Sequence, residues 1–149
     1  GTDMDAKSAN SSLSSTTWTR VCGTVDSSHV ARLYINAVEV ASYTQQDTGG
    51  GSPADDSSGE LHIGDKQNVS SRDFDGNLCY VFIWSKALTT AEMAEAMLPP
   101  EFVGDSKKGN WPINGDSPEG DLSGVGNTGT VNGTTASAIG PPVMLGSGS

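Results

Sequence analysis

Short runs of β-favouring residues alternate along the chain with long polar stretches. Residues 1–17 hold almost no large apolar side chain, so we expect a loop or a polar lead segment there. From Trp18 onward, β-branched and aromatic residues recur in short runs bounded by turn residues, and this pattern predicts strands. The predicted strands are residues 18–25, 30–35, 38–43, 61–64 and 78–84.

The connections between these runs carry their own signals. Asn36 and Ala37 separate two predicted strands, and a two-residue connection that begins with Asn indicates a tight hairpin. Residues 44–59 contain three consecutive glycines, a proline and two adjacent aspartates, so we expect a long loop without regular structure.

One short helix is predicted at residues 90–97. Thr89 is placed to cap the amide of Glu92 while the Glu92 side chain reaches back, which is the reciprocal capping box. Leu88 precedes this cap and is spaced to pack on Met93, as in a hydrophobic staple. Alanines favour the helix, and the two prolines that follow end it.

Composition supports an all-β domain of ordinary size. The chain has 149 residues, of which 34% are hydrophobic and 17% charged, and it contains 19 glycines. Good helix formers are scarce, which favours strands over helices. The net charge of −10 repels phosphate backbones and anionic lipids, so we expect neither nucleic acid nor a membrane surface as a partner.

Residues for catalysis are absent from the pattern. The acidic residues fall mostly in predicted loops, whereas a glycoside hydrolase needs two carboxylates that face each other across a cleft. Neither His29 nor His62 stands in a nucleophile motif. We therefore predict no enzyme and no catalytic residues.

Metal and disulfide chemistry is equally sparse. Cys22 and Cys79 lie far apart and lack metal-ligand spacing, so we expect two small buried thiols, with one disulfide as the alternative. Loop acids could supply oxygen ligands to calcium, but no Asp-x-Asp-x-Asp-Gly loop is present. We predict no metal site and no cofactor, with calcium left as an open alternative. The candidate calcium ligands are Asp55, Asp56, Asp73 and Asp75.

Five motifs in series resemble the C-terminal half of laminin-G-like, concanavalin-A-like jelly-roll domains. They are Trp-x-x-Val-x-Gly at 18–23, Leu-Tyr-Ile-Asn at 33–36, Leu-x-Ile-Gly at 61–64, Phe-x-Gly at 74–76 and Ala-Leu-Thr-x-x-Glu at 87–92. The resemblance implies an all-β, antiparallel β-sandwich (a jelly roll) with one short helix. Residues 111–143 resemble the segment that closes many phage and environmental proteins of this group.

These observations divide the chain into three parts. Residues 1–17 are the polar lead segment or loop, and 18–98 are the laminin-G-like portion of the sandwich. Residues 99–149 form a Gly/Asn/Ser-rich extension that packs on the sandwich or links it to something else.

Two departures from the family pattern concern the backbone. The sandwich needs several strands ahead of Trp18, so we expect the chain to be a fragment, or another chain to supply those strands. Ala37 stands where the family hairpin usually has Gly. Because a type I′ turn needs positive φ at both central positions, at a cost to Ala of about 1 kcal/mol, we expect another turn type there.

The third departure is an aromatic row. Tyr80, Phe82 and Trp84 recur with period two, while the residues between them are also apolar, so both faces of this strand are apolar. An antiparallel sandwich strand should have one solvated face. Either residues 90–97 and the region around Trp111 cover the row, or the row contacts a partner. We predict Tyr80, Phe82 and Trp84 as partner-binding residues.

The function that follows is a non-catalytic structural or interaction module of a surface assembly. We expect a virion decoration, fibre or filament component that binds protein neighbours, with a homo-oligomer among them, located on a virion or at an extracellular or cell surface. The alternative is a glycan-binding, lectin-like domain of a secreted or surface protein.

Overall fold

The computed structural model describes residues 5–50, 59–64, 74–96, 106–113 and 118–132. Within these residues the fold is all-β with one short helix, as the sequence predicts. The strands are β1 (Asp5–Ser8), β2 (Val21–Val25), β3 (Ala31–Ile35), β4 (Val38–Glu39), β5 (Tyr43–Asp47), β6 (Val81–Trp84) and β7 (Lys107–Trp111). The helix is α1 (Thr90–Glu95).

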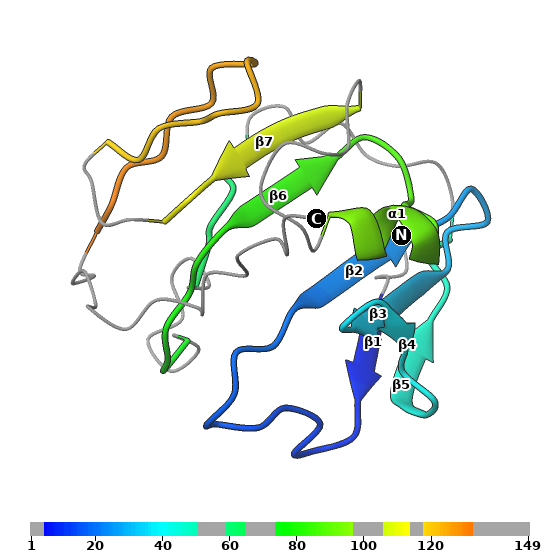
Figure 1. Cartoon of the computed structure of the whole chain (residues 1–149). Coiled ribbons are helices and arrows are strands. Elements are labelled where there is room, and N and C mark those ends of the chain that lie inside the picture. The colour runs from blue at the N-terminus through cyan, green and yellow to red at the C-terminus, as the bar shows by residue number, and fades with distance from the viewer. Residues whose placement is uncertain (1–4, 51–58, 65–73, 97–105, 114–117, 133–149) are drawn as a thin grey trace, which may run out of the picture. The chain divides into compact units, whose positions relative to one another are not determined.

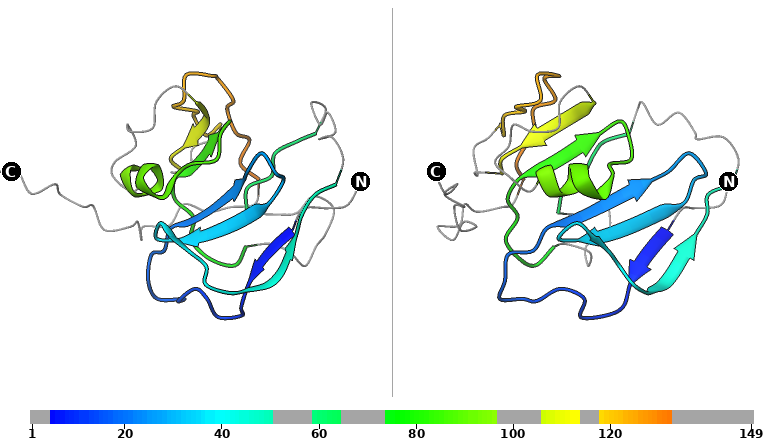
Figure 2. Two further views of the ribbon diagram at one scale, coloured as in Figure 1. Left: turned by 90° about the vertical axis from the view of Figure 1, so that its right-hand side faces the viewer. Right: turned by 45° about the vertical axis from the view of Figure 1, so that its right-hand side comes forward.

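Contacts within the chain divide the described residues into two compact units. The first unit contains residues 5–50, 84–96 and 106–108, and the second contains 59–64, 74–83, 109–113 and 118–132. Figure 1 shows the strands β1 to β5 of the first unit, and Figure 2 shows them from two further sides.

The first unit is organised around β3. The order in its three-stranded sheet is β2-β3-β4, and both pairings are antiparallel. The strand β5 then returns along β3, where side chains replace most of the backbone pairing. The Tyr43 hydroxyl accepts a hydrogen bond from the Leu33 amide at 2.9 Å, and Gln46 Nε2 donates to the Ala31 carbonyl at 2.8 Å. The strand β5 also pairs antiparallel with β1, and β1 itself lies close to β3.

The hairpin between β3 and β4 keeps the tight turn but corrects the expected turn type. Asn36 and Ala37 have φ values of 50° and 64°, so both central residues are left-handed and the prediction of another turn type is wrong. Contacts with residues distant in the sequence offset the strain at Ala37. Its side chain packs against the core, and Asn36 exchanges hydrogen bonds with the backbone of Arg20.

The core of the first unit lies between the sheet and the helix. Tyr34, Leu88 and Met93 are buried together, which agrees with the predicted staple. Thr89 Oγ1 accepts from the Glu92 amide at 3.3 Å, and a Glu92 carboxylate oxygen accepts from the Thr89 amide at 2.9 Å. The capping box is therefore confirmed. The end of the predicted range 90–97 lies outside the described residues.

Two predicted loops contain strands. β1 lies within the expected lead segment 1–17, and β5 overlaps the expected loop 44–59, so both predictions are wrong at these positions. Their polar sequences conceal the pairing, because side chains contribute to it. Lys7 Nζ donates to Gln45 Oε1 at 2.6 Å across the two strands.

Two predicted strands are absent or shortened in the second unit. Residues 61–64 form no strand. The strand expected at 78–84 begins only at Val81, because Tyr80 has a φ of 52° and breaks the extended run. β6 pairs with β7, and Figure 1 shows this two-stranded sheet.

Candidate binding surface

The predicted aromatic row falls into two parts. The rings of Tyr80 and Phe82 stack in the second unit with centroids 6.3 Å apart and planes 9° from parallel. Tyr80 is 44% exposed, whereas Phe82 is half-buried. Trp84 instead packs in the first unit against the cluster that contains Leu88 and Met93. Partner binding by Tyr80, Phe82 and Trp84 stays a prediction, and Trp84 in addition packs against a core.

A second surface emerges only from the register of the first unit's sheet. Val21 pairs with Ile35, and Ile35 pairs with Val38, so one row of aliphatic residues crosses three strands. Directly opposite residues lie on the same face, and the face repeats every second residue. We call this surface the aliphatic face. Its members are Val21, Gly23, Val25, Ala31, Leu33, Ile35, Val38 and Val40.

The aliphatic face is open to solvent. Val38 is 69% exposed, Val21 52% and Val25 46%, while Leu33 and Ile35 on the central strand are half-buried. A contiguous exposed apolar surface of this kind marks an interaction site more often than scattered exposed residues do.

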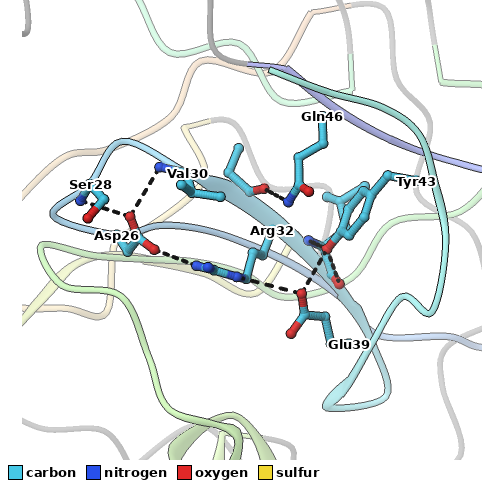
Figure 3. Close-up of polar contacts among 9 residues, drawn as sticks. Asp26, Ser28, Val30, Arg32, Glu39, Tyr43 and Gln46 are labelled. Atoms are coloured by element: carbon cyan, nitrogen blue, oxygen red, sulfur yellow. Dashed lines mark hydrogen bonds and ion pairs between the residues drawn. The ribbon is translucent and has the colours of Figure 1, made fainter. Parts of the chain in front are cut away.

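By strand alternation, the charged residues Arg32 and Glu39 lie on the opposite face of the same sheet, and Figure 3 shows their polar contacts. Arg32 Nη1 donates to Asp26 Oδ2 at 2.5 Å, and Arg32 Nε lies 3.6 Å from Glu39 Oε1. Alternation places Arg32 and Glu39 on the side of Tyr34 and the helix. The sheet therefore has one charged, helix-covered side and one uncharged, open side.

The Asp26 carboxylate also fixes the turn between β2 and β3. Its Oδ1 accepts from the amides of Ser28 and Val30 at 2.9 and 3.1 Å. The hydrogen bond from Arg32, followed by that from Val30, lowers the pKa of Asp26 below its ordinary value. The negative charge of Asp26 thus stabilises both the turn between β2 and β3 and the ion pair with Arg32.

The other chemical candidates find little support among the described residues. There, no group of three or more His, Cys, Asp or Glu side chains gathers to hold a metal ion. Asp55, Asp56 and Asp73 lie outside the described ranges and Asp75 is exposed, so the calcium alternative stays untested. Cys22 is a half-buried free thiol whose pKa is raised by burial.

The aliphatic face had a signal in the sequence that the strand prediction did not use. The alternate residues of β2 and β3 are aliphatic or glycine on one side, but only the pairing shows that the two sets lie together.

In the part of the chain that the structure describes, no helix is long and apolar enough to cross a membrane.

Comparison with known proteins identifies the family. A laminin-G-type family model, described as the concanavalin A-like lectin/glucanases superfamily, matches residues 1–94. No curated protein and no solved structure matches the chain. The match includes the five strands of the first unit and nearly all of α1. The chain therefore belongs to the laminin-G-like branch of the concanavalin A-like superfamily.

Proposed function

We propose that the chain is a non-catalytic interaction module of a surface assembly, and that it binds protein neighbours through the aliphatic face. Membership of the superfamily supports a generic binding module. The single observation that carries the finer proposal is the open row of Val21, Ile35 and Val38.

The physical reason is the free energy of exposed aliphatic surface. Burial gains about 25 cal/mol for each Å² of apolar area removed from water. A sheet face that is covered by a neighbour recovers this free energy, whereas an open one does not. The charged side chains of the sheet lie on the opposite face. A protein neighbour can therefore cover the aliphatic face without desolvating a charged group, which also supports binding there.

We further propose that the assembly is a virion decoration, fibre or filament, or another extracellular or cell-surface structure. The support for a virion is the resemblance of residues 111–143 to the closing segment of phage proteins.

Light scattering coupled to size-exclusion chromatography tests the proposal. We expect the protein to elute as an oligomer whose mass exceeds the 15.3 kDa of one chain, and the oligomer to grow with concentration. A mass of one chain at every concentration would contradict an assembly built from this chain.

The stacked pair of Tyr80 and Phe82 favours a second candidate function, glycan binding. Aromatic rings provide rigid apolar area onto which sugar rings can stack, and Tyr80 is 44% exposed. In this case we expect robust hits on a glycan array that are lost in Tyr80→Ala. Leu61→Ala is the control, because Leu61 is an exposed apolar residue of the same unit. An array without hits would contradict the lectin function.

A further inference from the structure

We infer that the stacked pair of Tyr80 and Phe82 selects a glycan that carries protonated amino groups, such as an oligomer of glucosamine. This inference rests on the second candidate function, glycan binding, and names the chemical class of the sugar. Three observations on the second unit support it: the support of the Tyr80 ring, the backbone conformation at Tyr80, and the balance of charge in the unit.

The Tyr80 ring rests on a second ring. Its plane lies 9° from that of Phe82, and the two centroids are 6.3 Å apart, which is an offset stack. Tyr80 is 44% exposed, whereas Phe82 is half-buried. Phe82 is thus the supporting ring and Tyr80 the one that a ligand can reach. A supported ring offers apolar area that is already ordered, so a ligand that stacks on it loses little free energy to side-chain ordering.

The backbone conformation at Tyr80 is strained. Its φ of 52° lies in the left-handed region, which a residue with a Cβ rarely adopts. The Tyr80 amide donates to the Pro112 carbonyl at 3.2 Å, and this bond ties the strained residue to the segment that follows β7. Strain of this kind persists only where the surrounding fold imposes it, and it gathers at ligand sites. The fold therefore fixes the position of Tyr80 at a cost in stability.

The charge of the second unit has one sign. Its described residues include four carboxylates and neither Lys nor Arg, whereas those of the first unit include six acidic and six basic residues. The adjoining sequence segments 51–58, 65–73 and 114–117 contain five acidic and two basic residues. The summed field of such a unit attracts cations and repels anions. The four described carboxylates belong to Glu60, Asp75, Glu119 and Asp121.

Ring and charge together favour a positively charged sugar. The face of an aromatic ring attracts a cation that lies within about 6 Å of its centroid. A protonated amine on a sugar that stacks on Tyr80 would gain from this attraction and from the field of the unit. A sulfate on the same sugar would be repelled by that field, and a neutral acetamide would gain the stacking alone.

Three oligomers of one sugar test the inference on the full chain by isothermal titration calorimetry. They are glucosamine oligomers of equal length with free amines, with acetylated amines and with sulfated amines. We expect the free-amine oligomer to bind about tenfold or more tightly than the acetylated one, and the sulfated one not to bind. Added salt should weaken binding of the free-amine oligomer and leave that of the acetylated oligomer unchanged, because salt screens attraction between charges.

Tyr80→Gly tests whether the stacked pair is the site. Glycine adopts a positive φ without strain, so this variant should fold while it lacks the ring, and circular dichroism establishes its fold. It should lose about tenfold or more of the affinity for the free-amine oligomer. Leu61→Ala is the control, because Leu61 is an exposed apolar residue of the same unit, and it should bind like the parent.

The double variant Glu60→Gln/Asp75→Asn tests the contribution of charge. Both residues are exposed, so their replacement should leave the fold intact while it removes two negative charges from the unit. We expect weaker binding of the free-amine oligomer, by about threefold or more, and unchanged binding of the acetylated one. Equal weakening of both oligomers would contradict selection by charge.

The outcomes separate this inference from the glycan-binding function. Acetylated oligomer that binds as tightly as the free-amine form, and is lost in Tyr80→Gly, would overturn the preference for amines and leave glycan binding standing. Binding of the free-amine oligomer that persists in Tyr80→Gly would overturn the assignment to the stacked pair. Failure of all three oligomers to bind would refute the inference, and the glycan array then decides whether the lectin function also falls.

Discussion

Gly109 lies beneath the indole ring of Trp111 on β7. A Cβ at position 109 would lie 2.9 Å from Cζ2 of that ring and nearer still to two other ring carbons. The ring has little room to move, because Trp111 is only 5% exposed and its Nε1 donates to the Asn127 carbonyl at 2.6 Å. At this position, glycine is thus required by packing.

Gly109→Ala should lower the free energy of unfolding by about 1–3 kcal/mol, the usual effect of overpacking. Urea denaturation followed by circular dichroism measures it. Gly120→Ala is the matched control, because no heavy atom lies within 4 Å of a Cβ at that position. Equal stability of the two variants would show that the Trp111 ring can move aside.

Single residues also define the limits of prediction. Thr89 and Glu92 could be predicted because a capping box depends only on residues three apart. The conformation of Ala37 could not, because its strain is offset by contacts with distant residues. Positive φ at Tyr80 has no signal in the local sequence, and it shortened the predicted strand.

At the scale of elements, the loop 118–129 of the second unit is organised by one carboxylate. Asp121 accepts hydrogen bonds from the amides of Asn110, Ser123 and Asn127 at 2.8–2.9 Å and from the Ser123 hydroxyl at 2.8 Å. The Leu122 amide also donates to the Asn110 carbonyl at 2.8 Å. The loop is therefore fastened to β7 through Asp121.

These bonds set a pH dependence for the loop. Desolvation by itself raises the pKa of Asp121, but the hydrogen bonds from Ser123, Asn127 and Asn110 outweigh it and lower the pKa from 3.8 to about 2. A carboxylate whose pKa is lower in the folded state stabilises that state above the unfolded pKa, and this stabilisation is lost as the pH falls. We expect the loop to be held fully above about pH 4 and released progressively toward pH 2.

Amide hydrogen exchange of Ser123 and Asn127, measured between pH 5 and pH 2 with correction for intrinsic rates, follows this release. The control is Asp121→Asn, which cannot ionise and should show weak protection at every pH. Protection in the parent that is unchanged at pH 2, or a variant that matches the parent at pH 5, would contradict the role of Asp121.

The strands differ in how far their sequences predict them. β2 and β3 follow the apolar alternation that predicted them, although each is shorter than its predicted range. β1 and β5 carry polar side chains on both faces. They pair with each other, although a long stretch of sequence separates them. Local propensity does not reveal such a pairing, because its stability comes from hydrogen bonds between the two strands.

For the molecule as a whole, the order of five short motifs was enough to predict the family and the fold class. The binding surfaces were harder to predict. The row of Tyr80, Phe82 and Trp84 was inferred from period two alone. The structure packs Trp84 against a core and stacks the other two, and partner binding by the three residues stays a prediction. The aliphatic face depends on strand register, which the sequence of one strand does not contain.

The two-sided sheet of the first unit is an amphiphile in its own right. Its uncharged side favours air, oil or a hydrophobic resin over water, while the side that carries Asp26, Arg32 and Glu39 favours water. At such a boundary the sheet should adsorb in one fixed orientation. A coating made from this protein would then present the charged side of every sheet outward, with no linker or tag to direct it.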